Sequence, residues 1–342
     1  MVQQVKINKV GSLFAIQLDR PAVLNALSFE MLLELKTHLI HAFTDVDVKT
    51  IWLESTQQKA FCVGGDVKAL ALEIDSFALD IEKSTLGLKY FELEYGVDLL
   101  IENSPKPIVA FSQGMTFGGG WGLFAGANLR LCDANASFSM PENQIGFFPD
   151  VGAAAFLQKN QRKLGAFLGI SGIRLSAYDA IALGFVDKII SSNYAQILKS
   201  QLSKGLNVSE LDIECELENI DGIYAQWQEG IALLPEDSAL IDWLSIVERN
   251  VNFEPFVKAK KCWLTASPWS IAFTWEYFRM HRDSSRQQVL EKDSQVGAYF
   301  CTHPEFYEGV HTKLIHKTGT PKWMYSHVES VPMDAINKAI AN

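Results

Sequence analysis

The chain of 342 residues lacks long apolar segments. No apolar run reaches the roughly 18 residues that a membrane-spanning helix needs. The first twenty residues, MVQQVKINKVGSLFAIQLDR, alternate polar and apolar side chains as a strand does, without the apolar stretch of a signal peptide. We therefore expect neither a membrane anchor nor an export signal.

Cysteine and histidine are too scattered to suggest a disulfide framework or a zinc site. The cysteines are odd in number, widely spaced and never form a CxxC pair, and the seven histidines contain no HxxxH spacing. The five cysteines are Cys62, Cys132, Cys215, Cys262 and Cys301. This pattern predicts no metal and a reducing, cytoplasmic setting.

The chain also has fewer positively than negatively charged side chains. Lys and Arg number 30 against 40 Asp and Glu, which gives a net charge of −10 and a pI near 5.2. A nucleic-acid-binding surface needs clustered Lys and Arg to neutralise phosphates, so nucleic acid is not expected as a partner. The 48% hydrophobic content is enough for the large core of a globular protein.

Strand and helix patterns alternate along the first part of the chain. Two strands are predicted around Gly11, a helix follows Ser28, and TIWLES, KPIVAFSQ and LRLCDANASFSM are extended. This alternation through about residue 190 predicts an α/β fold with crossover connections. Residues 205–260 have acidic helical patterns and 268–313 are almost continuously helix-compatible, so we expect a core over 1–204 and a mainly helical region over 205–342.

Two glycine-rich segments, AFCVGGDVKAL and GMTFGGGWGLFAG, each follow a predicted strand and precede a predicted helix. Backbone N–H groups at such turns can face a negative oxygen, which is the geometry of an oxyanion hole. The plainer interpretation is that these glycines only allow tight turns and close helix packing. A third interpretation is a dinucleotide-binding turn, because GWGLFA matches GxGxxA after a strand.

The stretch FSMPENQIGFFPDVG, residues 138–152, places two carboxylates among apolar, amide, glycine and proline residues. Buried carboxylates without a partner are costly, so such residues cap helices, meet cations or perform chemistry. Glu142 could lie in the first turn of a helix after Pro141, and Asp150 could cap the helix that follows. Acid–base or nucleophilic catalysis by the pair is the alternative.

Four segments resemble, in order and spacing, the crotonase (enoyl-CoA hydratase/isomerase) superfamily. They are LDRPAVLNAL, KAFCVGGDVK, GMTFGGGWGL and MPENQIGFFPDVG, and the likeness covers residues 10–190. AFCVGGD, the MPE and GFFPDVG pair and the C-terminal EFYEGVHTKLIHKTGTPKW are most similar to the 3-hydroxyisobutyryl-CoA hydrolase branch. The likeness therefore extends, more loosely, to the end of the chain.

The resemblance implies a spiral of ββα repeats that binds an acyl-CoA and holds its thioester oxygen on two backbone N–H groups. Those groups map to Gly65 and Gly119, with Gly64 and Gly118 beside the substrate. Coenzyme A is then part of the substrate, and no other cofactor is expected. The resemblance also makes a homo-oligomer possible.

Superfamily hydratases resemble one another in having two catalytic glutamates, and this chain has Gly122 where the first is expected. The second corresponds to Glu142, while Asp150 matches the aspartate that hydrolases have after FP. A pair formed by Glu142 and Asp150 favours hydrolysis over hydration, with one group attacking or activating water and the other assisting.

Other positions have weaker assignments. Glu94 matches a glutamate expected to bind the 3-hydroxyl of the substrate, but it could equally be a solvated helix charge. A lysine that often contacts the CoA phosphates is replaced by Ala22, which leaves Lys68, Lys313 and Lys317 as candidates. We interpret Cys62 as a small packed side chain.

The sequence therefore predicts a cytoplasmic thioester hydrolase that acts on 3-hydroxyisobutyryl-CoA or a close 3-hydroxyacyl-CoA in valine catabolism. The first alternative is an enoyl-CoA hydratase or isomerase that uses the same oxyanion hole. The second is a non-catalytic acyl-CoA-binding protein that keeps the fold. Nicotinamide binding would instead support the dinucleotide interpretation of GWGLFA.

Overall fold

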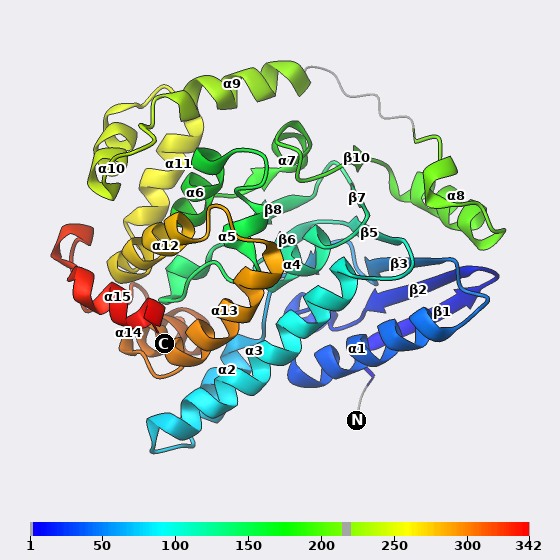
Figure 1. The fold of residues 1–342 in the computed structure, drawn as a ribbon, viewed down its shortest axis with the longest axis horizontal. Coiled ribbons are helices and arrows are strands. Elements are labelled where there is room, and N and C mark those ends of the chain that lie inside the picture. Colours follow the sequence, from blue (N-terminus) through cyan, green and yellow to red (C-terminus); the bar gives the residue numbers. More distant parts are fainter. Residues whose placement is uncertain (1–2, 214–219, 342) are drawn as a thin grey trace. The chain divides into compact units, whose positions relative to one another are not determined.

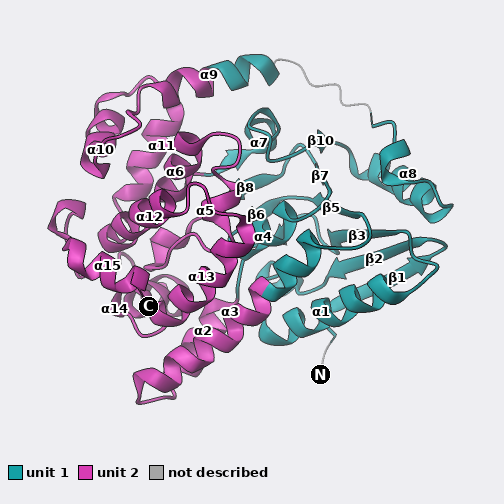
Figure 2. Cartoon of the chain, viewed as in Figure 1, with its two compact units in different colours: residues 1–65, 96–138, 174–225 teal, residues 66–95, 139–173, 226–342 magenta. Residues whose placement is uncertain are grey.

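The computed structural model describes residues 3–213 and 220–341, so Cys215 lies outside the described residues. The chain forms two compact units, shown in two colours in Figure 2. Unit 1 contains residues 1–65, 96–138 and 174–225, and unit 2 contains residues 66–95, 139–173 and 226–342. Helices α3 (Asp80–Glu102) and α9 (Ile220–Ala232) contribute residues to both units.

A six-stranded sheet with the order β1-β2-β3-β5-β7-β10 forms the main layer of unit 1 (Figure 1). β1 pairs with β2 in antiparallel register, and every later neighbour in this sheet is parallel. The strands are β1 (Val5–Val10), β2 (Leu13–Leu18), β3 (Thr50–Ser55), β5 (Ile108–Ser112), β7 (Leu129–Cys132) and β10 (Lys188–Ile189). This mostly parallel sheet agrees with the predicted crossover connections.

A second sheet of unit 1 has four short strands in the order β4-β6-β8-β9. Its strands are β4 (Ala60–Cys62), β6 (Met115–Phe117), β8 (Ser137–Ser139) and β9 (Leu175–Ser176). β4 and β6 run parallel, and each ends immediately before one of the two glycine-rich turns. This sheet therefore positions both turns at the ends of neighbouring strands.

Helix α1 (Phe29–Thr44) contacts β1 and β2 within unit 1. It begins at Ser28, whose Oγ accepts the Met31 N–H at 3.1 Å, as the sequence predicts for a helix cap. Its apolar stripe is buried, including Met31, Leu35 and Leu39. The other helices of unit 1 are η1 (Pro21–Val23), α4 (Gly119–Ala125), α7 (Ala177–Ala182), α8 (Ser192–Ser203) and η3 (Val208–Glu210).

Unit 2 is helical in the part that the structure describes. Besides parts of α3 and α9, unit 2 has further helices, among which α6 packs against α12, α5 against α13 and α10 against α11. They are α2 (Val67–Ile74), η2 (Glu142–Ile145), α5 (Ala153–Phe156), α6 (Arg162–Ser171), α10 (Leu240–Arg249), α11 (Glu254–Trp263), α12 (Pro268–Met280), α13 (Arg286–Phe300), α14 (Pro304–Val310), η4 (His311–His316), η5 (Val328–Ser330) and α15 (Met333–Ala341).

A cluster of aromatic rings fills the core of unit 2 around Phe147 and Phe148. Phe147 lies 5.5 Å from Phe91 of α3 and 5.0 Å from Phe300 of α13, measured between ring centroids. Phe148 lies 5.3 Å from Phe273 of α12. Such rings bury large apolar areas and interlock in tilted or offset pairs. The segment between Glu142 and Asp150 is thereby held against three helices of its own unit.

Most of the predicted elements occur where the sequence places them, with two differences. The helix expected over 268–313 is broken into α12, α13 and α14 by capped turns, the first of them closed by Ser285 and Gln288. The extended segment LRLCDANASFSM bends at residues 133–136, where Ala136 N–H donates to Asp133 O. The predicted boundary at 204/205 remains a prediction, because the two compact units follow a different division of the chain.

Candidate active site

The predicted site residues fall into two groups, and each group lies within one compact unit. The backbone candidates belong to unit 1 and the side-chain candidates to unit 2. Unit 1 contains Gly64, Gly65, Gly118 and Gly119, and unit 2 contains Lys68, Glu94, Glu142 and Asp150.

The first glycine turn follows β4 in unit 1. Gly64 has φ of 101°, in a region that L side chains rarely adopt, and its carbonyl accepts the Leu27 N–H at 2.9 Å. Leu27 and Gly65 also form an isolated parallel bridge. The turn is therefore fixed from the outside by the segment that precedes α1, and Gly65 is half-buried.

The second turn opens helix α4. Gly118 has φ of 49° and caps the helix, and its carbonyl accepts the N–H groups of Trp121 and Gly122 at 2.8 and 3.1 Å. Gly119 is the first residue of α4, so its N–H lies before the first N–H group that bonds within the helix. The helix start therefore presents a backbone N–H at Gly119 that the helix itself does not use.

The two turns lie against each other within unit 1. A Cβ placed on Gly64 would lie 3.3 Å from Gly119 N, and one on Gly120 would lie 2.3 Å from Cys62 O. Glycine is thus required for this close approach of two backbone segments. Tight packing is one reason for these glycines, and it brings Gly64, the residue before Gly65, close to Gly119. The use of Gly65 and Gly119 in binding an oxyanion remains a prediction.

Two other sequence interpretations concern this region. Cys62 is fully buried and its thiol contacts Asn25 O at 3.1 Å, in agreement with a packed side chain. The GWGLFA motif, residues 120–125, lies entirely inside α4, so its glycines do not form the strand-to-helix turn of a dinucleotide site. The structure therefore gives the dinucleotide interpretation no support.

Glu142 and Asp150 lie at the two ends of one compact segment of unit 2. Glu142 begins the short helix η2 after Pro141, as predicted. Gly146 ends that helix at φ of 69°, and a Cβ there would lie 2.0 Å from Glu305 O, so only glycine fits. Asp150 precedes α5 but does not cap it, because Gly152 holds the cap position without a side-chain bond. The capping interpretation of Asp150 is therefore wrong.

Both carboxyls are strongly buried, with exposed fractions of 8% for Glu142 and 6% for Asp150. Burial raises the pKa of Asp150 to about 7. Burial, and then the neighbouring charge of Asp150, raise the pKa of Glu142 well above its usual range. Because each ionised group disfavours ionisation of the other, the pair favours one negative charge over two near neutral pH.

The two carboxyls differ in their hydrogen bonds. Asp150 Oδ2 accepts the hydroxyl of Tyr95, from α3, at 2.6 Å. Glu142 Oε2 is buried and meets no hydrogen-bond donor among the residues that the structure describes. Buried carboxylate oxygens are normally partnered, so this exception marks Glu142 as a candidate reactive group.

Tyr95 and Asp293 are components of the site that the sequence did not reveal. Burial, and then the charge of Asp150, raise the pKa of Tyr95 well above its usual range. Asp293 of α13 is fully buried and accepts the Gly152 N–H at 2.8 Å. Gly152 lies two residues after Asp150 in the chain. Tyr95 directly follows Glu94, and the resemblance of the FELEYGVDLL segment to the hydrolases was the available signal. For Asp293, 143 residues beyond Asp150, the sequence contains no local signal.

Glu94 and the lysines meet different environments. Glu94 is 2% exposed, so the interpretation as a solvated helix charge is wrong, and its role toward the substrate remains a prediction. Lys68 is exposed on α2, where a phosphate contact stays a prediction. Lys313 donates to Gln144 Oε1 at 2.9 Å and to Thr265 O at 3.3 Å, and burial lowers its pKa. Lys313 therefore bonds to groups of the protein itself, whereas Lys317 is exposed at the end of η4.

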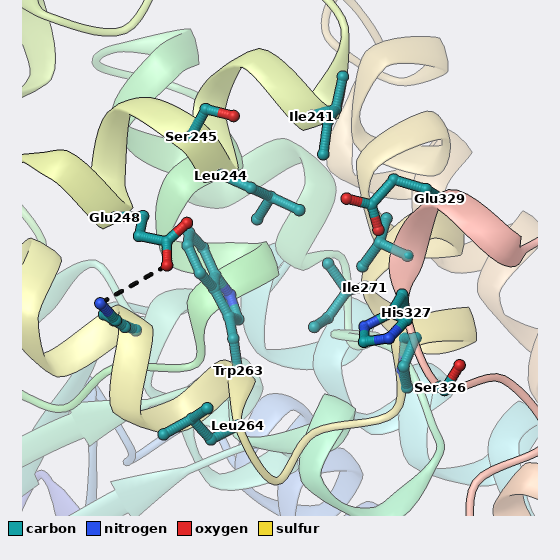
Figure 3. A pocket seen from close by; sticks show the side chains of 13 residues that line it. Ile241, Leu244, Ser245, Glu248, Trp263, Leu264, Ile271, Ser326, His327 and Glu329 are labelled. Atoms are coloured by element: carbon teal, nitrogen blue, oxygen red, sulfur yellow. Dashed lines mark ion pairs between the residues drawn. The ribbon is translucent and has the colours of Figure 1, made fainter.

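Two cavities of unit 2 are lined by residues other than the predicted site residues. One of about 410 Å³ is lined by residues that include Trp263, Ile271 and His327, with Glu248 and Lys260 paired at 3.8 Å beside it (Figure 3). The other, of about 610 Å³, is lined by residues that include His303 and Tyr307. Neither lining includes Glu142, Asp150, Glu94 or Lys68, so these cavities do not identify the candidate site.

Within residues 3–213 and 220–341, no group of three or more His, Cys, Asp or Glu side chains is arranged to hold a metal ion. No helix in the same part of the chain is both long and apolar enough to cross a membrane.

Comparison with known proteins places this arrangement in a family. The profile of the enoyl-CoA hydratase/isomerase family matches residues 13–340. The chain belongs to this family. Its predicted resemblance to the crotonase superfamily is thereby confirmed, over more of the chain than the four sequence segments covered.

Curated relatives have more than one role in their names. The mitochondrial 3-hydroxyisobutyryl-CoA hydrolase of Gallus gallus is 31% identical over 338 residues, which are 96% of this chain and 86% of that protein. The protein of the same name from Danio rerio is 30% identical and covers 99% of this chain and 90% of its own. The small ribosomal subunit protein mS47 of Neurospora crassa is 28% identical over 97% of this chain and 70% of that protein.

Solved structures confirm the predicted fold class. The crystal structure of an enoyl-CoA hydratase from Rhodobacter sphaeroides has a TM-score of 0.86 at 26% identity and covers 99% of this chain and 97% of its own. A carnitinyl-CoA dehydratase from Mycobacterium thermoresistibile has a TM-score of 0.87 at 23% identity, covering 100% of this chain and 97% of its own. The protein therefore has the crotonase-like α/β fold with a helical C-terminal region.

Proposed function

We propose that this enzyme of the enoyl-CoA hydratase/isomerase family hydrolyses an acyl-CoA thioester, and that its substrate is 3-hydroxyisobutyryl-CoA. The observation that carries the proposal is the buried pair of Glu142 and Asp150 with raised pKa values, in a chain that has glycine at position 122, where the resembled hydratases have a glutamate. The names of the relatives from Gallus gallus and Danio rerio support this substrate. The reaction would serve valine catabolism.

In the proposed reaction, the N–H groups of Gly65 and Gly119 bind the thioester oxygen and stabilise the negative charge that develops on it. Glu142 acts in the singly ionised form of the pair in which the proton lies on Asp150, and it either attacks the acyl carbon or removes a proton from an attacking water. Asp150 assists by giving a proton to the departing thiolate. Water supplies the hydroxyl of the product acid, and CoA leaves as the free thiol.

The remaining predicted residues have binding roles in this proposal. Glu94 binds the 3-hydroxyl of the acyl group, and analogues without the hydroxyl would bind less well because they cannot form this hydrogen bond. Gly64 and Gly118 keep side chains away from the thioester, and Lys68 lies near a CoA phosphate. We propose no metal or redox cofactor.

The partners and the compartment also remain proposals. We expect an acyl-CoA as the ligand, no nucleic acid, and a possible homo-oligomer. The sequence predicts a cytoplasmic location, whereas the names of several relatives specify mitochondria. Fractionation of cells that produce the full protein, with antibodies to a marker of each compartment, would decide between these locations.

Two alternatives have a specific observation in their favour. The similar structure from Rhodobacter sphaeroides is titled an enoyl-CoA hydratase, which favours hydration or isomerisation of an enoyl-CoA. The relative from Neurospora crassa is named as a ribosomal protein, which favours a non-catalytic protein of the same fold. A two-glutamate hydratase would need a carboxylate where this chain has Gly122, and a protein without activity would not need the buried pair.

The deciding experiment measures thiol release from 3-hydroxyisobutyryl-CoA, with hydration of crotonyl-CoA measured in parallel. The wild-type chain is compared with Glu142→Gln and Asp150→Asn, and with Asp187→Asn as a carboxylate control in unit 1. Thiol release that collapses in the first two variants and persists in the third supports the hydrolase. Hydration of crotonyl-CoA without thiol release would support the hydratase, and binding of the CoA ester without either reaction would support the non-catalytic protein.

A further inference from the structure

The backbone immediately after Asp150 adopts an unusual conformation. Val151 and Gly152 have φ of 52° and 78°, both in the left-handed region. A β-branched residue strongly disfavours this region, so the surroundings must hold Val151 there. Val151 is also fully buried, so protein atoms and not solvent surround its side chain. The turn that follows Asp150 is therefore imposed by its neighbours.

Two side chains of helix α13 hold this turn. Asp293 Oδ2 accepts the Gly152 N–H at 2.8 Å, and Arg286 Nη2 donates to Val151 O at 3.1 Å. The Arg286 side chain lies so close that a Cβ on Gly152 would be 2.6 Å from Arg286 Cγ. One helix thus contacts the turn through a donor, an acceptor and direct packing.

Asp293 is itself held from a second helix. Its Oδ1 accepts the Tyr277 hydroxyl, from α12, at 2.6 Å, and the aspartate is completely buried. Its two oxygens therefore link α12 to the turn. On the other side of the turn, Tyr95 of α3 holds the Asp150 carboxyl at 2.6 Å. The position of Asp150 is consequently set by one bond to its side chain and by another to the backbone two residues later.

We propose that Asp293 is a positioning residue for Asp150, which fixes the 150–152 turn so that the Asp150 carboxyl stays on Tyr95 and beside Glu142. This inference rests on the proposed hydrolase function. Asp293 contacts the Gly152 N–H and not the reacting atoms, so it acts through the backbone. Displacing a reacting group by about 1 Å can cost a hundredfold in rate, which is why such a residue matters.

The charges around the turn agree with this role. Burial raises the pKa of Asp293 well above its usual range, and the charge of Asp150 raises it further. The Tyr277 hydroxyl, the Gly152 N–H and the Arg286 guanidinium act in the opposite direction. Asp293 and Asp150 therefore influence each other both through the turn and through their charges.

The test compares Asp293→Ala with Asp293→Asn. Alanine removes the acceptor for the Gly152 N–H, and we expect kcat for thiol release to fall by about a hundredfold with little change in KM. Asparagine keeps one oxygen for the Gly152 N–H, and its amide can donate to Tyr277 once that hydroxyl rotates. We expect Asp293→Asn to recover kcat to within about tenfold of the wild type.

A matched control separates this effect from a general loss of stability. Asp187→Ala in unit 1 also removes a carboxylate that accepts a backbone N–H, that of Arg130 at 2.7 Å, and a guanidinium at 2.6 Å. It should lower the melting temperature without lowering kcat. A lowered melting temperature with wild-type kcat in Asp293→Ala would overturn the inference, because the residue would then be only structural.

A double-mutant cycle tests whether Asp293 acts through Asp150. In an Asp150→Asn background, Asp293→Ala should cost less than about threefold in kcat, because the group that it positions is already impaired. A full hundredfold loss in that background would contradict the inference.

The proposed function fails separately, if the wild-type chain releases no thiol. Hydrogen exchange of residues 150–153 then decides alone: faster exchange in Asp293→Ala than in Asp293→Asn supports positioning, and equal exchange overturns it.

Discussion

The two compact units contain different kinds of candidate group. Unit 1 offers backbone N–H groups at two glycine turns, where Gly64 and Gly120 leave no room for a side chain. Unit 2 offers buried carboxyls, Glu142 and Asp150, whose charge depends on pH. Backbone dipoles do not titrate in the physiological range, whereas this carboxyl pair does. If both groups take part in the proposed reaction, unit 1 should contribute independently of pH and unit 2 should contribute in a pH-dependent way.

The largest effect is expected from Glu142→Gln, which removes the reactive carboxylate of unit 2. Thiol release should fall by about a thousandfold, because an amide can neither attack as a carboxylate nor accept a proton. Steady-state rates measure this loss, and circular dichroism checks that the variant is folded. A loss smaller than tenfold would mean that unit 2 does not supply the reactive group.

A smaller effect is expected from Gly120→Ala in unit 1. Its Cβ would lie 2.3 Å from Cys62 O, so the start of α4 and the Gly119 N–H must move. We expect kcat to fall by about a hundredfold, as for loss of an oxyanion donor, with no change in the midpoint of the pH–rate profile. Gly96→Ala is the control, because a Cβ there meets nothing within 4 Å. A shifted midpoint in Gly120→Ala would contradict the expectation that the unit 1 contribution does not depend on pH.

The pH–rate profile of the wild-type chain tests the titrating contribution directly. The pKa of Asp150 is raised to about 7, so kcat should decline below that pH by up to about tenfold per unit as the pair takes up a second proton. The midpoint belongs to the pair rather than to one residue. A rate that stays constant down to pH 5 would indicate that the carboxyl pair is not the base.

The last effect concerns stability, not rate, and is expected in the Asp150→Asn variant. The folded state raises the pKa of Asp150 from 3.8 to about 7, so stability is fully present below the unfolded value and is lost as pH rises toward 7. Asparagine avoids this loss, which is on the order of 4 kcal/mol between pH 4 and pH 8. Urea unfolding should therefore show a larger stabilisation by the substitution at pH 8 than at pH 5. An equal change at both values would contradict the raised pKa.

Much of the fold could be predicted from local sequence patterns. The Ser28 cap, the apolar stripe of α1 and the strands β3 and β5 all follow from residue spacing. The breaks between α12, α13 and α14 were missed because a helix-compatible composition does not reveal capped turns such as the one at Ser285. The interleaved course of the two units depends on contacts between distant segments, which no local pattern records.

The candidate site was predictable to the extent that its residues lie in motifs. The glycines and the segment from Glu142 to Asp150 are short, recognisable sequences, and the structure brings the two glycine turns together within unit 1. Tyr95, Tyr277 and Asp293 were missed because their importance comes from single bonds across 55, 16 and 141 residues of sequence separation. Burial of Glu94 was also missed, since α3 has no clear apolar stripe.

The division of the chain has a consequence for its synthesis. All segments of unit 1 lie within residues 1–225, whereas unit 2 needs residues 226–342 to join residues 66–95 and 139–173. As the chain leaves the ribosome, unit 1 can close while Glu142, Asp150 and the aromatic residues around Phe147 still lack α12 and α13. Such a nascent chain exposes apolar surface, to which chaperones can bind. Protease digestion of stalled chains ending near residue 250 should accordingly cut unit 2 segments first, and equal protection of both units would rule this order out.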